Sequence, residues 1–237
     1  MVQGDQKLTN NWGHRRCTMT WSGSTWAFTT PSTGNPLVEG PVLATWGDSR
    51  QTIPVSPGDG EVLLAVRTID NGNGTWNFEY ALLNKTSDRQ IRSFSLPVHG
   101  VPDIANISFH DNDNDPSNDW QMTLQDDTLK WQCEDYAQNP NARALMFGYQ
   151  FNFRFDAAAP PTTLDVSLGP FKPDTGTGNG VGPDVVVAST GPQNVVTGVG
   201  DLPRGAARVL EVRPNPFQRN TTTWYKAAPG AVALSIY

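Results

Sequence analysis

Hydrophobic and polar residues alternate along residues 147–156, where the odd positions are all aromatic and the positions between them are small, polar or charged. A period of two residues is typical of a β-strand with one buried and one solvated face. Residues 74–82 follow the same pattern, and the side chains expected to point inward are Trp76, Phe78, Tyr80 and Leu82. Both segments therefore predict strands of a sheet that covers a core with one face.

Shorter runs of the same kind recur along the chain up to residue 168. These further strands are predicted at residues 17–21, 25–29, 42–46, 61–70, 91–98, 105–110, 120–125, 128–133 and 162–168. Turn-forming residues separate them, for example Ser22-Gly23-Ser24 and Pro57-Gly58-Asp59-Gly60. A spacing of about ten residues per strand favours an all-β fold, and specifically an antiparallel β-sandwich. Only residues 140–147 suit a short helical turn, which excludes doubly wound and α/β-hydrolase folds.

A change of composition after Lys172 divides the chain into three predicted parts. Residues 1–172 form the β-sandwich domain. Residues 173–207 are rich in Gly, Pro and Val, and form an extended linker or exchanged strands, because the runs 185–187 and 195–197 are too isolated to build a core. Residues 208–237 form a small, incomplete second β unit.

Charge and hydropathy exclude two classes of partner. The net charge is −6, the pI is near 4.9 and no basic patch is present, so we expect no nucleic-acid partner. No apolar run approaches the length of a membrane span, so no transmembrane segment is predicted. The first residues lack the basic and apolar regions of a signal peptide, and we expect the numbering to begin inside a longer precursor.

The two cysteines, Cys17 and Cys133, each lie in or beside a predicted strand. One interpretation is a disulfide that joins the first strand to the middle of the domain, as in exported proteins. The alternative is two buried free thiols. Two thiols and three scattered histidines make a zinc site improbable.

The densest polar cluster is the stretch 110–119. Its acidic residues are Asp111, Asp113, Asp115 and Asp119. Calcium binds oxygen ligands in compact loops of this kind, so these four residues are a candidate calcium site. Pro116 stands where an EF-hand has glycine, and Met122 where it has the closing glutamate, so the loop is not an EF-hand. The alternative is a solvated loop held by Asx-turns.

The segment Trp46-Gly47-Asp48-Ser49 resembles the nucleophile block of Gly-Asp-Ser hydrolases. A serine nucleophile needs a base, and in those enzymes the base is a histidine three residues after an aspartate. None of the three histidines, His14, His99 and His110, has that neighbour. Glycosidase-like pairs drawn from Asp70, Glu79 and Glu134 rest on spacing alone. We therefore predict no catalytic residue and no enzyme.

The chain has eight tryptophans, which makes glycan binding a hypothesis, because sugars stack on exposed indole rings. Trp76, Trp120 and Trp131 alternate with polar residues and are predicted to be core. The less clearly placed rings are Trp12, Trp21, Trp26 and Trp46. Among the Asn-x-Ser/Thr sequons, Asn73 lies in a Gly-rich turn and is the candidate glycosylation site.

Part of the chain resembles an uncharacterised family of secreted bacterial proteins. The similar segments are Asn139-Pro140-Asn141-Ala142-Arg143-Ala144-Leu145, 149–156, 159–163 and 168–173, and the similarity extends back to about Trp76. This family has no activity that can be transferred, so the resemblance implies an exported β domain.

The tail resembles a second family. The segment Val212-Arg213-Pro214-Asn215-Pro216-Phe217, with 221–225 and 232–237, is similar to the opening strands of C-terminal sorting domains. Bacteria with the type IX secretion route use these domains to export proteins and attach them to the cell surface. More strands follow in that family, so the resemblance implies an extracellular or cell-surface protein whose chain is truncated here.

These observations lead to three hypotheses of function. The first is a secreted structural or adhesive protein that associates with itself or with other surface proteins, its tail completing a neighbour's sheet by strand addition. The second is a carbohydrate-binding module, which requires coplanar exposed aromatic rings. The third is an enzyme of unrecognised type, which requires a pocket with convergent carboxylates or histidines. Calcium is the one candidate cofactor.

Overall fold

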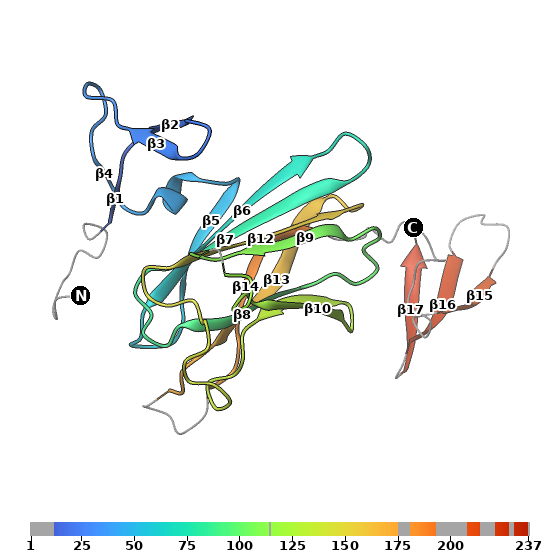
Figure 1. Cartoon of the computed structure of the whole chain (residues 1–237). Helices are drawn as coiled ribbons and strands as arrows, with labels where there is room; N and C mark the ends of the chain where they lie inside the picture. Colours follow the sequence, from blue (N-terminus) through green and yellow to red (C-terminus); the bar gives the residue numbers. More distant parts are fainter. Residues whose placement is uncertain are drawn as a thin grey trace. The chain divides into compact units, whose positions relative to one another are not determined.

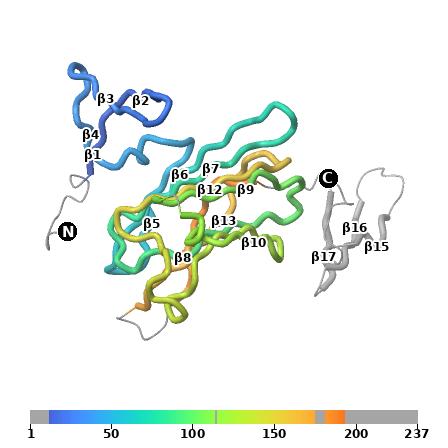
Figure 2. Tube along the Cα trace, viewed as in Figure 1, coloured from blue at the N-terminus to red at the C-terminus, as the bar shows by residue number. Residues whose placement is uncertain are grey.

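The structure is a computed structural model that describes residues 12–113, 115–174 and 181–192 with their side chains, and the backbone of three strands at 208–213, 221–227 and 230–236 (Figure 2). The chain divides into two compact units, Met1–Asn194 and Val195–Tyr237. Each unit is described by itself.

Two five-stranded antiparallel sheets form the body of the first unit (Figure 1). Sheet 1 has the order β5 (Ser49–Pro54), β6 (Glu61–Asp70), β7 (Trp76–Asn84), β12 (Gln150–Ala157) and β9 (Ala105–His110). Sheet 2 has the order β10 (Gln121–Gln125), β11 (Thr128–Gln132), β8 (Ile91–Pro97), β13 (Pro161–Pro170) and β14 (Val185–Pro192). The predicted all-β sandwich is confirmed.

The alternation of β12 explains why it lies centrally in sheet 1. Phe151, Phe153 and Phe155 are at most 1 % exposed, while Asn152 and Arg154 between them are exposed. One residue of shift would exchange the two sets of side chains, so the pattern fixes the register against β7 and β9. Phe147, from the same aromatic run, precedes the strand and is 55 % exposed.

An aromatic cluster joins the two sheets. Phe153 of sheet 1 lies 4.9 Å from Phe94 and 5.3 Å from Trp131 of sheet 2, measured between ring centroids. On its other side it contacts Phe109 and Trp120 at 5.5 and 5.8 Å. All four contacts are tilted, and non-sandwich arrangements of this kind stabilise aromatic pairs beyond the burial of their area. The core of the domain is centred here.

A smaller apolar cluster lies on the outer face of sheet 1. It consists of Leu43, Leu63, Ala65, Ala81 and Leu83, with Trp12 and Trp46 packed against it. Leu43 comes from η2 (Val42–Thr45), a 3₁₀ turn where the sequence predicts a strand. The strand predicted at 42–46 is therefore wrong. A half-buried strand would bury alternate side chains, whereas only Leu43 is buried in this turn. Gly47, at φ +83°, then turns the chain against the carbonyl of Val66.

The N-terminal region forms two short strand pairs: β1 (Gly13–His14) with β4 (Val38–Glu39), and β2 (Thr18–Trp21) with β3 (Trp26–Thr29). The two strands predicted at 17–21 and 25–29 are therefore confirmed as a hairpin. Residues 140–147 form turns and one isolated bridge, so the predicted helical turn is wrong.

The described part of the tail belongs to the sandwich. β14 pairs antiparallel with β13 of its own chain over eight residue pairs, from Pro161↔Pro192 to Leu168↔Val185. The domain boundary predicted at residue 172 is therefore wrong, because β14 belongs to the sandwich.

A second contact holds β14 within its own chain. Gln51 of β5 donates a hydrogen bond to the Ala188 carbonyl at 2.8 Å. For residues 185–192, pairing within the chain replaces the expected strand exchange. The run 195–197 lies outside the described residues.

The second unit contains one three-stranded antiparallel sheet in the order β15 (Arg208–Arg213), β16 (Thr221–Ala227) and β17 (Gly230–Ile236). The three strands expected in the tail are present. The Pro-Asn-Pro-Phe segment at 214–217 lies outside the described residues. Among the residues that the structure describes, no helix is long and apolar enough to cross a membrane.

Truncation of Phe153 tests the aromatic cluster. Phe153→Ala leaves a cavity between the sheets, and we expect a loss of about 3–5 kcal/mol in the free energy of unfolding, measured by urea denaturation. The control is Phe147→Ala from the same aromatic run, which we expect to cost less than about 1 kcal/mol because the ring is exposed. Equal losses would contradict the described core.

The hydroxyl of Tyr80 tests the attachment of β14. Tyr80 donates a hydrogen bond to the Thr190 carbonyl at 2.9 Å. Burial raises the pKa of this phenol above its ordinary value. The folded state therefore keeps the proton at a pH where the unfolded state releases it, so stability is full below about pH 10 and falls above it.

We expect Tyr80→Phe to cost about 1 kcal/mol at neutral pH, through loss of the hydrogen bond. We also expect it to flatten the alkaline decline of stability, measured by urea denaturation between about pH 8 and 11. The matched control is Tyr136→Phe, at a half-buried tyrosine that lies against Phe171. If the unfolding free energy of Tyr80→Phe fell with pH as steeply as that of the wild type, another group would cause the decline.

Candidate functional site

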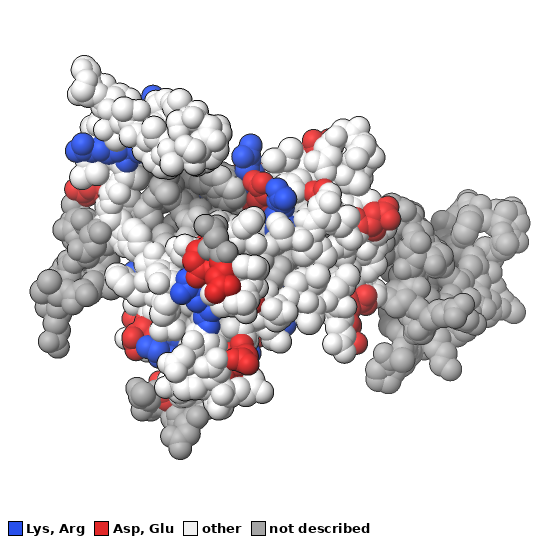
Figure 3. All heavy atoms as spheres, in the orientation of Figure 1, with Lys and Arg blue, Asp and Glu red and all other residues white. Residues whose placement is uncertain are grey.

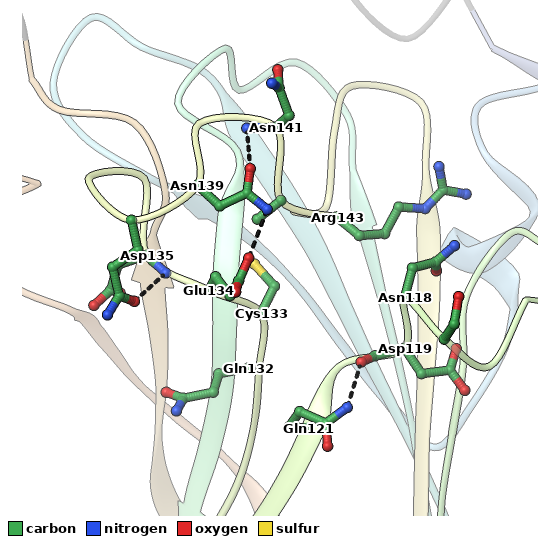
Figure 4. A pocket seen from close by; sticks show the side chains of 13 residues that line it. Asn118, Asp119, Gln121, Gln132, Cys133, Glu134, Asp135, Asn139, Asn141 and Arg143 are labelled. Carbon is green, nitrogen blue, oxygen red and sulfur yellow. Dashed lines mark hydrogen bonds between the residues drawn. The ribbon is translucent and has the colours of Figure 1, made fainter.

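A polar cleft of about 640 Å³ lies where three segments of the first unit meet (Figure 4). The segments are the end of the acidic loop with the start of β10, the end of β11, and the following loop. The lining residues are Ser117, Asn118, Asp119, Gln121, Gln132, Cys133, Glu134, Asp135, Gln138, Asn139, Asn141, Ala142 and Arg143. None of them is aromatic, and six carry a carboxamide.

Two glutamines on neighbouring strands contribute to the wall of the cleft. Gln121 and Gln132 are directly opposite each other in the antiparallel ladder of β10 and β11, so their side chains lie on the same face of sheet 2. The Gln121 amide donates to the carbonyl of Asp119 at 3.2 Å. Within the described part of the chain no hydrogen bond of that kind holds the Gln132 side chain, which presents both a donor and an acceptor.

The loop after β11 is held in shape by its own polar groups. Asn139 donates from Nδ2 to a carboxylate oxygen of Glu134 at 2.6 Å, and its Oδ1 accepts from the backbone N–H of Asn141 at 3.0 Å. Asp135 forms an ion pair with Arg92 of β8 at 2.9 Å. These contacts fix one wall of the cleft relative to sheet 2, and leave Glu134 with a second oxygen for a ligand.

Arg143 connects the loop to the acidic stretch on the opposite wall. Its guanidinium contacts Asp111 at 3.3 Å and Asp113 at 2.6 Å, and lies 5.3 Å from the ring centre of Tyr149. The Arg143 carbonyl accepts a hydrogen bond from the Trp120 indole at 2.6 Å. Because the Asp111 side chain is 1 % exposed, the guanidinium supplies the positive charge that a buried carboxylate requires.

The acidic stretch folds through Asx-turns, which was the alternative to a calcium loop. Backbone N–H groups of Asp113, Asp115 and Ser117 donate to the carboxylates two residues earlier at 2.8, 2.8 and 3.0 Å. The two hydrogen bonds from Ser117 lower the pKa of Asp115. Within 12–113, 115–174 and 181–192, no group of three or more His, Cys, Asp or Glu side chains is placed to hold a metal ion. Calcium stays a prediction, and Arg143 takes the cation's place beside Asp111 and Asp113.

Two groups of the acidic wall differ from solvated side chains. Partial burial, and then the nearby charges of Asp111 and Asp113, raise the pKa of Asp119 above its ordinary value. The Asn118 Oδ1 atom is buried and has no hydrogen-bond partner among the described residues. A hydroxyl or N–H group of a ligand in the cleft would donate to the Asp119 carboxylate.

The cleft therefore favours a neutral, hydroxyl-rich ligand. Carboxamides donate and accept hydrogen bonds at once, and carboxylates accept pairs of them, which suits the vicinal hydroxyls of a sugar. Arg143, the one basic residue in the lining, is already paired with two carboxylates, so the lining offers no unpaired positive charge to an anion. Of the candidate residues found from the sequence, Asp119, Cys133 and Glu134 line this cleft.

The predicted disulfide is absent from the structure. Cys17 is an exposed free thiol directly before β2, and Cys133 is a half-buried free thiol after β11. Burial raises the pKa of Cys133 to about 12. The correction has a simple cause: Cys17 belongs to an exposed hairpin, whereas the backbone of Cys133 is bonded to Arg92 within sheet 2.

The candidate catalytic residues Ser49, Asp70 and Glu79 lie on β5, β6 and β7. The Ser49 hydroxyl lies 3.4 Å from the Thr190 hydroxyl. Asp70 accepts the backbone N–H of Gly72 in the turn between β6 and β7, and Glu79 lies within β7. The absence of an enzymatic activity remains a prediction.

Among the tryptophans, Trp120 and Trp131 are buried and Trp76 is partly buried against the core, as predicted. Trp21 and Trp26 are 52 % and 57 % exposed. Their rings are tilted by 52°, so they do not form the coplanar platform expected of a sugar-stacking face.

Asn73 is exposed in the turn before β7, which is compatible with the predicted glycosylation. Two other sequons are less suitable. Asn84 is buried, and its Nδ2 donates to Ser87 and Leu145, while Asn106 donates to Asp156 at 2.6 Å. The fourth, at Asn220, lies outside the described residues.

Comparison of the chain with protein-family models, with curated proteins and with solved structures gave no match.

Removal of Arg143 tests which cation the acidic loop uses. Arg143→Ala leaves Asp111 buried without a counter-charge, and we expect a loss of about 2–3 kcal/mol in unfolding free energy. Millimolar calcium should leave the Tm of the wild type unchanged and partly restore that of the variant. The control is Lys172→Ala, which breaks an exposed pair with Asp88 and should cost less than about 1 kcal/mol. Stabilisation of the wild type by calcium would refute Arg143 as the cation.

Proposed function

We propose that this chain is a secreted or cell-surface, non-enzymatic β-sandwich protein of adhesive or structural role that binds a neutral glycan in its polar cleft. The observation that carries the proposal is the concentration of carboxamides and carboxylates around one cleft of about 640 Å³. That volume lies in the range of small-ligand sites. The resemblance of segments in both units to exported bacterial proteins supports the location.

The cleft supports a binding role better than a catalytic one. Glu134 accepts from Asn139, and Asp135 is paired with Arg92, so two of its three carboxylates serve the loop that carries them. Asp119, whose pKa is raised by partial burial and by nearby acidic charges, lines the cleft together with six carboxamides. The side chains that remain available form hydrogen bonds, which is sufficient for recognition of hydroxyl groups.

Self-association remains part of the proposed role, but by a different route from strand addition through residues 185–192. β14 is already paired with β13, and its Ala188 carbonyl is bonded to Gln51. A surface outside the sandwich sheets is a better candidate for contact between copies.

Binding to a panel of immobilised neutral and acidic glycans, followed by calorimetry, tests the proposal. We expect the protein to bind neutral oligosaccharides. The variant Gln121→Ala/Gln132→Ala should lower their affinity at least about tenfold, a loss of about 1.4 kcal/mol, because it removes hydrogen-bonding groups from the cleft.

The matched control is Gln125→Ala/Thr128→Ala, the pair at the opposite end of the same two-stranded ladder. It should bind like the wild type, and both variants should keep a Tm within about 2 °C of it, because the substituted side chains contribute little to the core. Equal affinity of both variants, or binding of no neutral glycan, would contradict the proposed site.

A further inference from the structure

The hairpin of β2 and β3 exposes an apolar face. Its register pairs Met19 with Phe28 and Trp21 with Trp26, so all four side chains lie on one side of the two strands. Their exposed fractions are 60 % for Met19, 52 % for Trp21, 57 % for Trp26 and 66 % for Phe28. The opposite side carries Thr18, Thr20, Ala27 and Thr29. The hairpin is thus amphipathic, with its apolar side uncovered by any described residue.

Hydrogen bonds and one ring contact hold this hairpin together. Asn35 donates to the Arg16 carbonyl at 2.9 Å and accepts from the Arg16 N–H at 3.1 Å, and Ser22 and Thr25 close the turn. Every residue from 15 to 34 is exposed. An isolated two-stranded hairpin is marginally stable in water, so a second layer on the apolar face would stabilise it.

The charge distribution favours a second copy of the chain as this layer. No Asp, Glu, Lys or Arg occurs from Cys17 to Val38, although the chain carries a net charge of −6. In Figure 3 the lobe at the upper left is mostly white with blue atoms at its edges, while the body below it shows both signs of charge. Two copies can therefore bring their hairpins together without repulsion between like charges.

The arrangement of the four side chains suits a two-fold contact. In an isologous interface each residue meets the partner's surface in the same way, so a patch must be complementary to itself. One end of this face carries the two indoles and the other carries Met19 and Phe28. An antiparallel stack of two hairpins places indoles on the methionine and phenylalanine of the other copy, where sulfur and aromatic contacts are favourable.

We propose that this hairpin face is a self-association surface through which two copies of the chain form a weak, reversible dimer. Side chains of this size bury about 150–250 Å² each, so four that are half-exposed offer roughly 400 Å² per copy. The total for two copies, roughly 800 Å², is below the roughly 1,200 Å² at which stable specific interfaces begin, which fits weak, transient pairing at high local concentration. The tilt of 52° between the indoles makes stacking of a sugar less suitable.

Sedimentation velocity tests the proposal on the full chain. We expect the wild type to shift from monomer towards dimer between about 10 µM and about 1 mM, the range of Kd that fits so small an interface. Trp21→Ser/Trp26→Ser should remain monomeric throughout. The matched control is Met122→Ser/Leu124→Ser on β10, where the side chains are 43 % and 50 % exposed, and it should dimerise like the wild type.

A wild type that stays monomeric up to about 1 mM would overturn the proposal. In that case a lower Tm of Trp21→Ser/Trp26→Ser would show that the chain's own residues cover the face, and a change in glycan binding by this variant would show that a sugar does. If Trp21→Ser/Trp26→Ser dimerised as strongly as the wild type, the contact between copies would lie elsewhere on the chain. Each result is independent of the cleft, whose glycan binding is tested by other residues.

Discussion

Burial of the aromatic side chains of β12 between two sheets is the interaction on which the rest of this fold depends. Phe151, Phe153 and Phe155 project into the core, and their neighbours on the strand project into solvent. The period of two residues allows no shift in pairing without placing Asn152 and Arg154 in the core. The position of β12 in turn fixes the positions of β7 and β9, which pair with it. A rigid pair of sheets of this kind leaves the connecting loops free to carry recognition groups.

The cleft is formed largely by such connecting loops, and contacts with the aromatic core hold its walls in place. Trp120, which packs against Phe153, donates its indole N–H to the Arg143 carbonyl, and the Arg143 guanidinium pairs with Asp111 and Asp113. A single arginine thus links the aromatic core, the loop after β11 and the acidic stretch. Loops held by charge-assisted hydrogen bonds to a rigid element are pre-organised, which lowers the entropy that ligand binding must overcome.

The fold class could be predicted because alternation is a local signal, and the segments in which it is strong, 74–82 and 147–156, contain two central strands. The errors arise where distant residues decide the structure. Residues 42–46 contain as many apolar residues as a strand, but the outer face of sheet 1 accepts only Leu43 from them. The partner of β14 is β13, and no property of the sequence 185–187 identifies it.

The candidate site was less predictable than the fold for the same reason. Asp119 and Glu134 are each visible as acidic residues, but the cleft exists because β10 and β11 form a hairpin that brings their flanking loops together. The carboxamides at 132–141 were a local signal of unusual density that a search for catalytic motifs does not register. The guanidinium that pairs with the acidic loop comes from a residue distant in sequence, which is why a metal was the natural expectation from the loop alone.

The N-terminal hairpin shows the limit of the alternation rule most clearly. Met19 and Trp21 alternate with threonines just as the phenylalanines of β12 alternate with polar residues, yet one apolar set is at most 1 % exposed and the other is more than half exposed. Alternation predicts that a face is apolar, while the surroundings determine what covers it. Exposure of four large apolar side chains to water is unfavourable. Because the described domain leaves this face uncovered, the face indicates contact with another molecule.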